Sequence, residues 1–192
     1  KFKIDQSRSD TYLQAAGYIN RSEADIVSLQ HEFGLFGGYR GEHILSFVEN
    51  LKLPLVTTLH TVVDDPKSKY GIITKKLIKK SKVVIVMMEK IKEKLVNDYG
   101  VPTEKIVTIH HGTANLPFMS TEKYKKKRKL TNRIVLGNIN LLSPVKGIEY
   151  ALEAVAEVAK KYPKVLYLIT GQTHPVYKQL KGEKYRNLLK KT

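Results

Sequence analysis

The chain has 192 residues, of which 42% are hydrophobic and 27% are charged, an ordinary balance for a folded protein of one or two domains. It contains no cysteine, which excludes disulfide bonds and thiolate metal sites and favours a reducing compartment such as the cytoplasm. The formal net charge of +16 would attract phosphate groups, whether of a nucleotide, a nucleic acid or an anionic lipid.

The apolar runs of the chain are short. The longest, at 83–88 and 165–169, fall well below the ~20 residues that span a bilayer. Residues 1–10 are polar and lack the apolar core of a signal peptide, so no export signal is expected.

From Asp25 onward, β-branched runs alternate with segments of helical period, a pattern that predicts strand-helix units and a parallel sheet. Most of these runs are apolar on both faces, so we expect helices on both sides of the sheet. The predicted strands are 25–30, 55–61, 82–88, 105–109, 133–139 and 164–170.

Helices are predicted between the strands, because apolar residues recur there at helical spacing. Each apolar stripe is expected to be buried in a core. The stripes comprise Ile44, Leu45, Val48 and Leu51; Ile72, Ile73, Leu77 and Ile78; Ile91, Leu95 and Val96; and Ile148, Ala151, Leu152, Val155, Ala156 and Ala159, with Pro163 ending the last helix.

The strand-helix pattern lapses between Gly112 and Arg133, which predicts a boundary between a domain at 1–117 and a second at 118–192. A lysine-rich run at 123–129 lies in this interval. It is interpreted as a solvated helix face or linker, with an anion-binding segment as the alternative.

Histidines gather near the carboxyl ends of the predicted strands, where ligands bind in parallel α/β sheets. A single histidine at such a place is more often structural than functional, but five at one edge favour a site. None has the helical spacing of a metal-binding His-Glu-x-x-His pair, so no bound metal is predicted. The five are His31, His60, His110, His111 and His174, whereas His43 is predicted on a helix.

Glycines mark the same edge, where they allow tight turns and close approach of the backbone to a ligand. Turns also need glycine when no ligand is present. The chain lacks both the Gly-x-Gly-x-x-Gly and the Walker motifs, which disfavours a dinucleotide oxidoreductase and a nucleoside triphosphatase. The glycines concerned are Gly34, Gly37, Gly38, Gly112 and Gly171.

The segment 142–147, with sequence LSPVKG, predicts a site for a diphosphate. Lys146 is expected at the start of a helix, where free backbone N–H groups and the helix dipole already favour an anion. The alternative is a solvent-exposed lysine, although its charge would oppose the dipole there.

Five stretches together resemble the family-four retaining glycosyltransferases of the GT-B fold. The resemblance implies an α/β protein with two Rossmann-like domains facing across a cleft, the acceptor-side domain at 1–117 and a partial nucleotide-sugar-binding domain at 118–192. The stretches are 25–38 (DIVSLQHEFGLFGG), 55–61 (LVTTLHT), 101–112 (VPTEKIVTIHHG), 142–147 (LSPVKG) and 167–175 (YLITGQTHP).

The resemblance also implies roles for individual residues. The reaction would transfer a hexose from a nucleotide-sugar to an acceptor hydroxyl with retained anomeric configuration, without a metal or other cofactor. His60 would be the catalytic residue that faces the transferred sugar. The remaining implied sites are the donor diphosphate site, with Lys146, Gly147 and Ser143; the donor cleft, with His111, Gly112, Gly171 and His174; and an acceptor-side loop, with His31, Gly37 and Gly38.

Two departures from the family pattern bear on activity. The family's Gly-Arg-Leu stretch is replaced by Asn140, Leu141 and Leu142, and its paired glutamates have no counterpart before Thr192. The chain is therefore expected to be incomplete and inactive by itself.

The expected partners are a nucleotide-sugar donor and a carbohydrate or lipid-linked acceptor. The basic surface leaves open a peripheral contact with anionic lipid at the inner membrane surface. A non-catalytic module that binds nucleic acid is the competing interpretation. It is disfavoured because aromatic residues are not interleaved with the basic ones as stacking platforms for bases.

Overall fold

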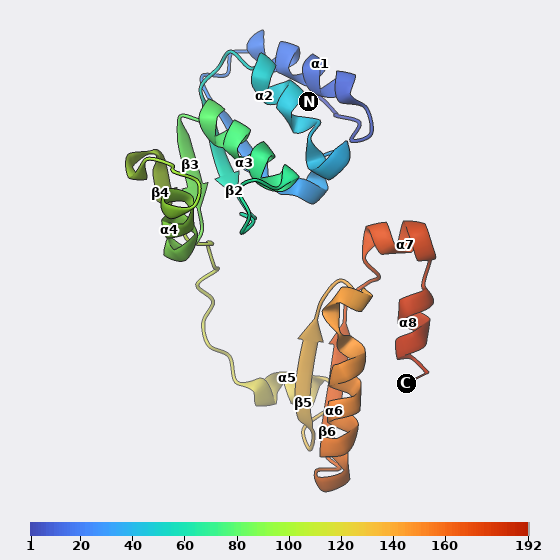
Figure 1. The fold of residues 1–192 in the computed structure, drawn as a ribbon. Coiled ribbons are helices and arrows are strands. Elements are labelled where there is room, and N and C mark those ends of the chain that lie inside the picture. The colour runs from blue at the N-terminus through green and yellow to red at the C-terminus, as the bar shows by residue number, and fades with distance from the viewer. Residues whose placement is uncertain (192) are drawn as a thin grey trace. The chain divides into compact units, whose positions relative to one another are not determined.

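The computed structural model describes residues 1–191, which form two compact units (Figure 1). The first unit comprises Lys1–Ala114, and the second begins at Asn115. This division and the predicted one after residue 117 both lie in the stretch 109–120, which contains neither helix nor strand.

The first unit contains a four-stranded parallel sheet in which every pair of neighbouring strands is also consecutive in sequence. Such connections all cross the sheet in one direction, and right-handed crossovers then place the connecting helices on one face. The strands, each of which lies within or overlaps a predicted one, are β1 (Val27–His31), β2 (Leu55–Leu59), β3 (Val83–Val86) and β4 (Ile106–Thr108).

Four α-helices and three short 3₁₀ helices accompany this sheet. Three of the α-helices were predicted from apolar periodicity, and α1 was not. The elements are α1 (Ser9–Asn20), α2 (Ile44–Asn50), α3 (Lys69–Lys80), α4 (Glu89–Asn97), η1 (Phe33–Leu35), η2 (Tyr39–Gly41) and η3 (Thr103–Lys105).

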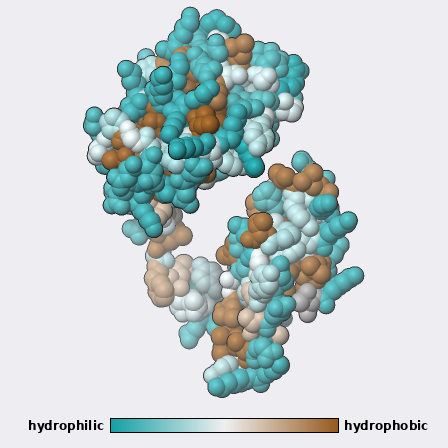
Figure 2. All heavy atoms as spheres, in the orientation of Figure 1, coloured by the Kyte–Doolittle hydropathy of each residue, from teal (hydrophilic) through white to brown (hydrophobic). Residues whose placement is uncertain are grey.

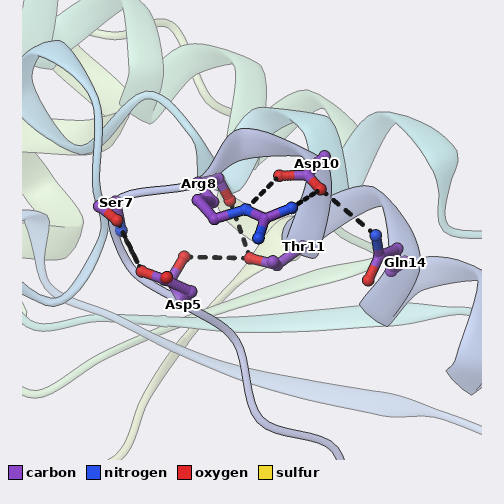
Figure 3. A network of polar contacts seen from close by, with 6 residues as sticks. All are labelled: Asp5, Ser7, Arg8, Asp10, Thr11 and Gln14. Carbon is purple, nitrogen blue, oxygen red and sulfur yellow. Dashed lines mark hydrogen bonds and ion pairs between the residues drawn. The ribbon is translucent and has the colours of Figure 1, made fainter.

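Helix α1 begins in a network of polar contacts (Figure 3). The Asp5 carboxylate accepts from the Ser7 hydroxyl at 2.7 Å, and the Thr11 hydroxyl donates to the carbonyl oxygen of Arg8 at 2.8 Å. Asp10, in the first turn, forms an ion pair of 2.7 Å with Arg8. A carboxylate at this position also complements the positive end of the helix dipole.

The strand residues that enter the cores of the first unit share one face of the sheet, because the register aligns Leu29, Thr57, Val84 and Ile106 across it. Residues of the opposite face enter neither core. The expectation of helices on both faces is therefore wrong for this unit within residues 1–191. The buried hydrophobic strand residues are Leu29, Leu55, Leu59, Val84, Val86 and Ile106, and the half-buried or exposed hydrophobic ones of the other face are Val56, Val83, Ile85 and Val107.

The second unit contains a two-stranded parallel sheet whose register runs from Ile134 opposite Val165 to Ile139 opposite Thr170. The strands and the long helix between them were predicted, and the exposed helix α5 agrees with the interpretation of the lysine-rich run as a solvated helix face. The other short helices of this unit were not predicted. The elements are α5 (Thr121–Lys127), β5 (Ile134–Ile139), η4 (Pro144–Lys146), α6 (Ile148–Lys161), β6 (Val165–Thr170), α7 (Pro175–Lys181) and α8 (Lys184–Leu189).

The core of the second unit is small, with Leu142, Ile148 and Tyr185 as its buried members. The prediction that the whole apolar stripe of α6 is buried is wrong. Ile148 is buried, whereas Ala156 is exposed and the other members of the stripe are half-buried. Ile72 on α3 likewise proves exposed. Hydrophobic residues lie on the surface of the second unit (Figure 2), because two strands offer too little sheet to cover the helix.

Within residues 1–191, no helix combines the length and apolar character needed to cross a membrane.

Candidate functional site

Four of the five predicted histidines lie at the carboxyl edge of the first sheet, whereas His174 lies in the second unit. His60 directly follows β2, and its backbone N–H donates to the carbonyl oxygen of His31 at 3.0 Å. The rings of His60 and His111 lie 6.2 Å apart between centroids. Nδ1 of His110 lies 2.9 Å from the carbonyl oxygen of Met87, to which it can donate. The exposed His60 and His111 are thus neighbours on the surface.

The ring of His60 is held by a side chain that the sequence analysis did not single out. Nε2 of His60 lies 2.9 Å from Oε1 of Gln30, and Nε2 of Gln30 donates to the Thr58 hydroxyl at 3.2 Å. Gln30 and His60 come from neighbouring strands, so their contact can be predicted only when the strand register is known. The register cannot be read from the sequence.

His31 requires a correction, because it is the last residue of β1 and is not in the loop that follows. Its side chain is 0% exposed and lies against Phe33 and Phe36, with ring centroids 4.8 and 5.5 Å away. Neither ring nitrogen has a hydrogen-bond partner among the described residues. Burial, assisted by the charge of His60 and opposed by that of Glu32, lowers the pKa of His31 to about 4. His31 is therefore a neutral core residue at pH 7.

Gly37 and Gly38 are explained by packing of the loop in which they lie. A Cβ on Gly37 would stand 1.6 Å from the carbonyl oxygen of Gln6, and the Gly37 N–H donates to the Tyr12 hydroxyl at 3.0 Å. Gly38 has a φ of 80°, which favours glycine. These contacts account for both glycines without a ligand.

In the second unit, the predicted donor residues gather at the carboxyl edge of β5 and β6. The segments that follow the two strands continue the sheet, since Leu142 bridges Thr173 and the His174 N–H donates to the Leu142 carbonyl at 2.9 Å. This arrangement brings the segment that contains Ser143 beside the one that contains Gly171.

Lys146 is the last residue of η4, and Gly147 follows it in the left-handed conformation as the N-cap of α6. The Lys146 side chain is exposed, and within residues 1–191 its ammonium makes no hydrogen bond or ion pair. The hydroxyl of Ser143 is buried and lacks a partner among the described residues. The Lys146 ammonium is therefore free to bind an anion, whereas the Ser143 hydroxyl is unpaired but not accessible at the surface.

Helix α8 supplies a residue to the start of α6 that the sequence analysis missed. The Tyr185 hydroxyl accepts from the backbone N–H of Ile148 at 3.2 Å and donates to the Glu149 carboxylate. Burial and the hydrogen bond with Glu149 raise the pKa of Tyr185 to about 12. The same hydrogen bond lowers the pKa of Glu149. One N–H group at the start of α6 is therefore already occupied.

Gly171 closes the edge of the second sheet, with a φ of 143°. A Cβ at this position would lie 1.8 Å from the carbonyl oxygen of Asn140, so glycine is required. Gly171 also lines a cavity of about 180 Å³ together with the basic residues Arg186 and Lys190. The positive charge beside this cavity suits a phosphate. Gly112 has open space around it in the exposed stretch after β4.

No group of three or more histidine, aspartate or glutamate side chains within residues 1–191 is arranged to hold a metal ion.

The sequence model of the protein family described as Glycosyltransferase Family 4 matches residues 7–114 of this chain. HepE of Anabaena, solved in complex with UDP, superimposes with a TM-score of 0.61 at 16% identity, over 95% of this chain and 47% of that one. Its structure with UDP and glucose gives a TM-score of 0.64 at 17% identity, over 94% and 48% of the two chains.

A glycosyltransferase from Rickettsia africae gives a TM-score of 0.57 at 16% identity, over 95% of this chain and 56% of that one. The chain thus spans about half the length of these solved structures. No curated protein sequence matches it significantly. The predicted fold class, α/β with Rossmann-like parallel sheets of the GT-B type, is confirmed by these likenesses.

Proposed function

Because this chain belongs to glycosyltransferase family 4, we propose that it serves the transfer of a hexose from a nucleotide-sugar donor to an acceptor hydroxyl, with retained anomeric configuration. The observation that carries the proposal is the family match over residues 7–114. The shared fold with HepE, whose structure contains UDP, supports a donor of the UDP-sugar type.

Lys146 is proposed to bind the donor diphosphate. Its free ammonium, the partnerless hydroxyl of Ser143 and the backbone around Gly147 lie in one segment after β5. Positive charge there would stabilise the nucleoside diphosphate as it leaves, since an ammonium placed where negative charge develops lowers the barrier. Arg186 and Lys190, beside Gly171, add charge that can offset the missing arginine of the family pattern.

His60 is proposed to be the catalytic residue that faces the transferred sugar, with His111 beside it. His60 is exposed at the carboxyl edge of the sheet, and Nδ1 of its ring makes no hydrogen bond within residues 1–191. An unprotonated ring nitrogen can accept a hydrogen bond from a sugar hydroxyl. His111 and Gly112 in the first unit and His174 in the second remain proposed donor-binding residues, and Gly37 and Gly38 remain proposed for the acceptor side.

The proposed acceptor is a carbohydrate or a lipid-linked sugar. The net charge of +16 supports a peripheral contact with an anionic membrane surface, which attracts lysine-rich segments. A metal or other cofactor is not part of the proposal, and a cytoplasmic location is proposed on the cysteine-free composition.

The test is titration of the 192-residue chain with UDP and a panel of UDP-hexoses by isothermal calorimetry. Lys146→Ala should weaken UDP binding roughly 10- to 100-fold, the range expected for a hydrogen bond to a charged group. Lys164→Ala is the matched control, because Lys164 directly precedes β6 and so lies at the opposite edge. Equal affinity of the Lys146→Ala variant and the unmodified chain would refute the diphosphate assignment.

Binding is the readout in this test, because we expect no turnover from these residues alone. Within residues 115–191, the second unit has two strands and a core of three buried residues, and the glutamate pair that holds the donor in the family has no counterpart in this sequence. Sugar transfer by the 192-residue chain would contradict that expectation.

The competing function is a basic module that binds nucleic acid, and its support is the exposed lysine-rich run that includes α5. Nucleic-acid affinity should fall steeply with salt, because counterion release dominates it. A nucleic-acid affinity that exceeds UDP affinity at physiological salt and survives Lys146→Ala would favour this module over the transferase.

A further inference from the structure

Gln30, Thr58 and His60 lie on one face of the first sheet. The register places Gln30 directly opposite Thr58, and alternate residues of a strand point to the same face. The ladder extends one residue past β2, because the His60 N–H donates to the His31 carbonyl oxygen. Two residues after Thr58, the His60 side chain therefore emerges on the side of Gln30.

We propose that Gln30 is a positioning residue that keeps the proton of the neutral His60 ring on Nε2. The Gln30 amide donates to Thr58 at 3.2 Å, which directs its oxygen Oε1 toward Nε2 of His60 at 2.9 Å. An amide oxygen only accepts, so the ring nitrogen that faces it must carry hydrogen. Nδ1 is left as an acceptor for a hydroxyl of the bound sugar, and this last step rests on the proposed function.

The His60 ring has other polar neighbours at the carboxyl edge of the sheet. The charged and titratable neighbours are the His111 ring at 6.2 Å, the buried His31 ring below, and Glu32, which accepts from Thr61 at 2.6 Å. The contact between Glu32 and Thr61 also ties the loop after β2 to the end of β1.

The test is a two-bond ¹H–¹⁵N correlation spectrum of the histidine rings in the donor-free, ¹⁵N-labelled chain. Above the pH at which the ring is charged, His60 should show the pattern of the Nε2–H tautomer. Gln30→Leu should shift the tautomer ratio toward Nδ1–H by about fivefold, the factor that a hydrogen bond of ordinary strength is worth. Thr58→Val, which removes the group that orients the amide, should shift the ratio in the same direction but less.

Two further variants test whether a change of tautomer comes from loss of the hydrogen bond between Gln30 and His60 or from a general disturbance of the structure. Gln30→Glu should restore the Nε2–H pattern, because a carboxylate can only accept. Gln179→Leu, at an exposed position on α7, is the matched control and should leave the His60 signals in place. An amide proton spectrum with undisturbed dispersion verifies that each variant is folded.

The proposal is overturned if His60 shows the Nδ1–H pattern in the unmodified chain, or if Gln30→Leu leaves the Nε2–H pattern unchanged. Because the spectrum is recorded without donor, these results are independent of whether the chain binds a nucleotide-sugar. Titration of the same sample with UDP-glucose tests the proposed function separately. If His60 shows the Nε2–H pattern and its signals do not change on addition of UDP-glucose, the role of Gln30 is supported and the proposed contact between Nδ1 and the sugar is contradicted.

Discussion

The hydroxyl of Tyr185 on α8 accepts a hydrogen bond from the backbone N–H of Ile148 at 3.2 Å, so α8 caps the start of α6. The first N–H groups of a helix have no partner within the helix, and here a tertiary contact supplies one. Tyr185 also donates to the Glu149 carboxylate. The proposed diphosphate site therefore lies beside a helix end whose position depends on α8.

Replacing Tyr185 with phenylalanine should destabilise the second unit. The variant keeps the ring in the core but leaves the buried Ile148 N–H without a partner, at a cost of about 1–2 kcal/mol. Amide hydrogen exchange should show faster exchange at Ile148 and in the first turn of α6. Tyr177→Phe is the control, because Tyr177 packs against Tyr185 and donates no hydrogen bond among the described residues. Unchanged protection at Ile148 in Tyr185→Phe would contradict the capping role.

Replacing Gly171 with alanine should disrupt the carboxyl edge of β5 and β6. The new Cβ would stand 1.8 Å from the Asn140 carbonyl oxygen, so the two segments would have to separate, and the φ of 143° is strained for alanine. We expect a loss of at least about 2 kcal/mol, seen as a lower urea midpoint for the second unit. Gly137→Ala, within β5 and with open space around it, should not destabilise. Equal midpoints for the two variants would contradict this packing argument.

The strands could be predicted from the sequence because their apolar runs are distinct, and all six are present in the structure. Helix α1 escaped prediction although Tyr12, Ala15, Ala16 and Ile19 recur at helical spacing, because small alanines give a weak apolar signal. Which face of the first sheet the helices cover could not be predicted, because a strand that is apolar on both faces does not reveal the face on which a helix packs.

The site could be predicted only as a set of strand ends. His60 and His111 come together because both follow strands of one parallel sheet, which the sequence pattern indicates. Gln30 and Tyr185 were missed because their roles depend on register and on a contact between distant segments, and neither leaves a local motif. His31 was misplaced by one residue, and that shift moves a side chain from a loop into the core.

Replacing Gly37 with alanine should destabilise the first unit. Its Cβ would lie 1.6 Å from the Gln6 carbonyl oxygen and 2.9 Å from Nδ1 of His43, so the N-terminal segment would be displaced from the loop. We expect a loss of at least about 2 kcal/mol, measured as a lower thermal midpoint. Gly34→Ala, in the same loop with nothing within 4 Å, should change the midpoint little. If the two variants have the same thermal midpoint, the stability of the loop does not depend on the close approach of Gly37 to the Gln6 carbonyl oxygen.

The neutral state of His31 links the stability of the first unit to pH. The pKa is about 4 in the folded chain, against an ordinary value of 6.5, so the unfolded state binds more protons between these two values. The stabilisation is fully present above pH 6.5 and is lost as pH falls toward 4. A difference of this size amounts to about 3 kcal/mol.

His31→Leu should therefore remove much of the acid sensitivity of the first unit. Both ring nitrogens lack partners among the described residues, and burying an unpaired polar group is costly, so an apolar side chain of similar size should be at least as stable at pH 7. Urea denaturation of the variant and the unmodified chain at several pH values between 4 and 7 measures the effect. The two curves of unfolding free energy should diverge as pH falls. Parallel curves would mean that His31 takes up its proton in the folded state without cost, and that its burial is not what sets its charge.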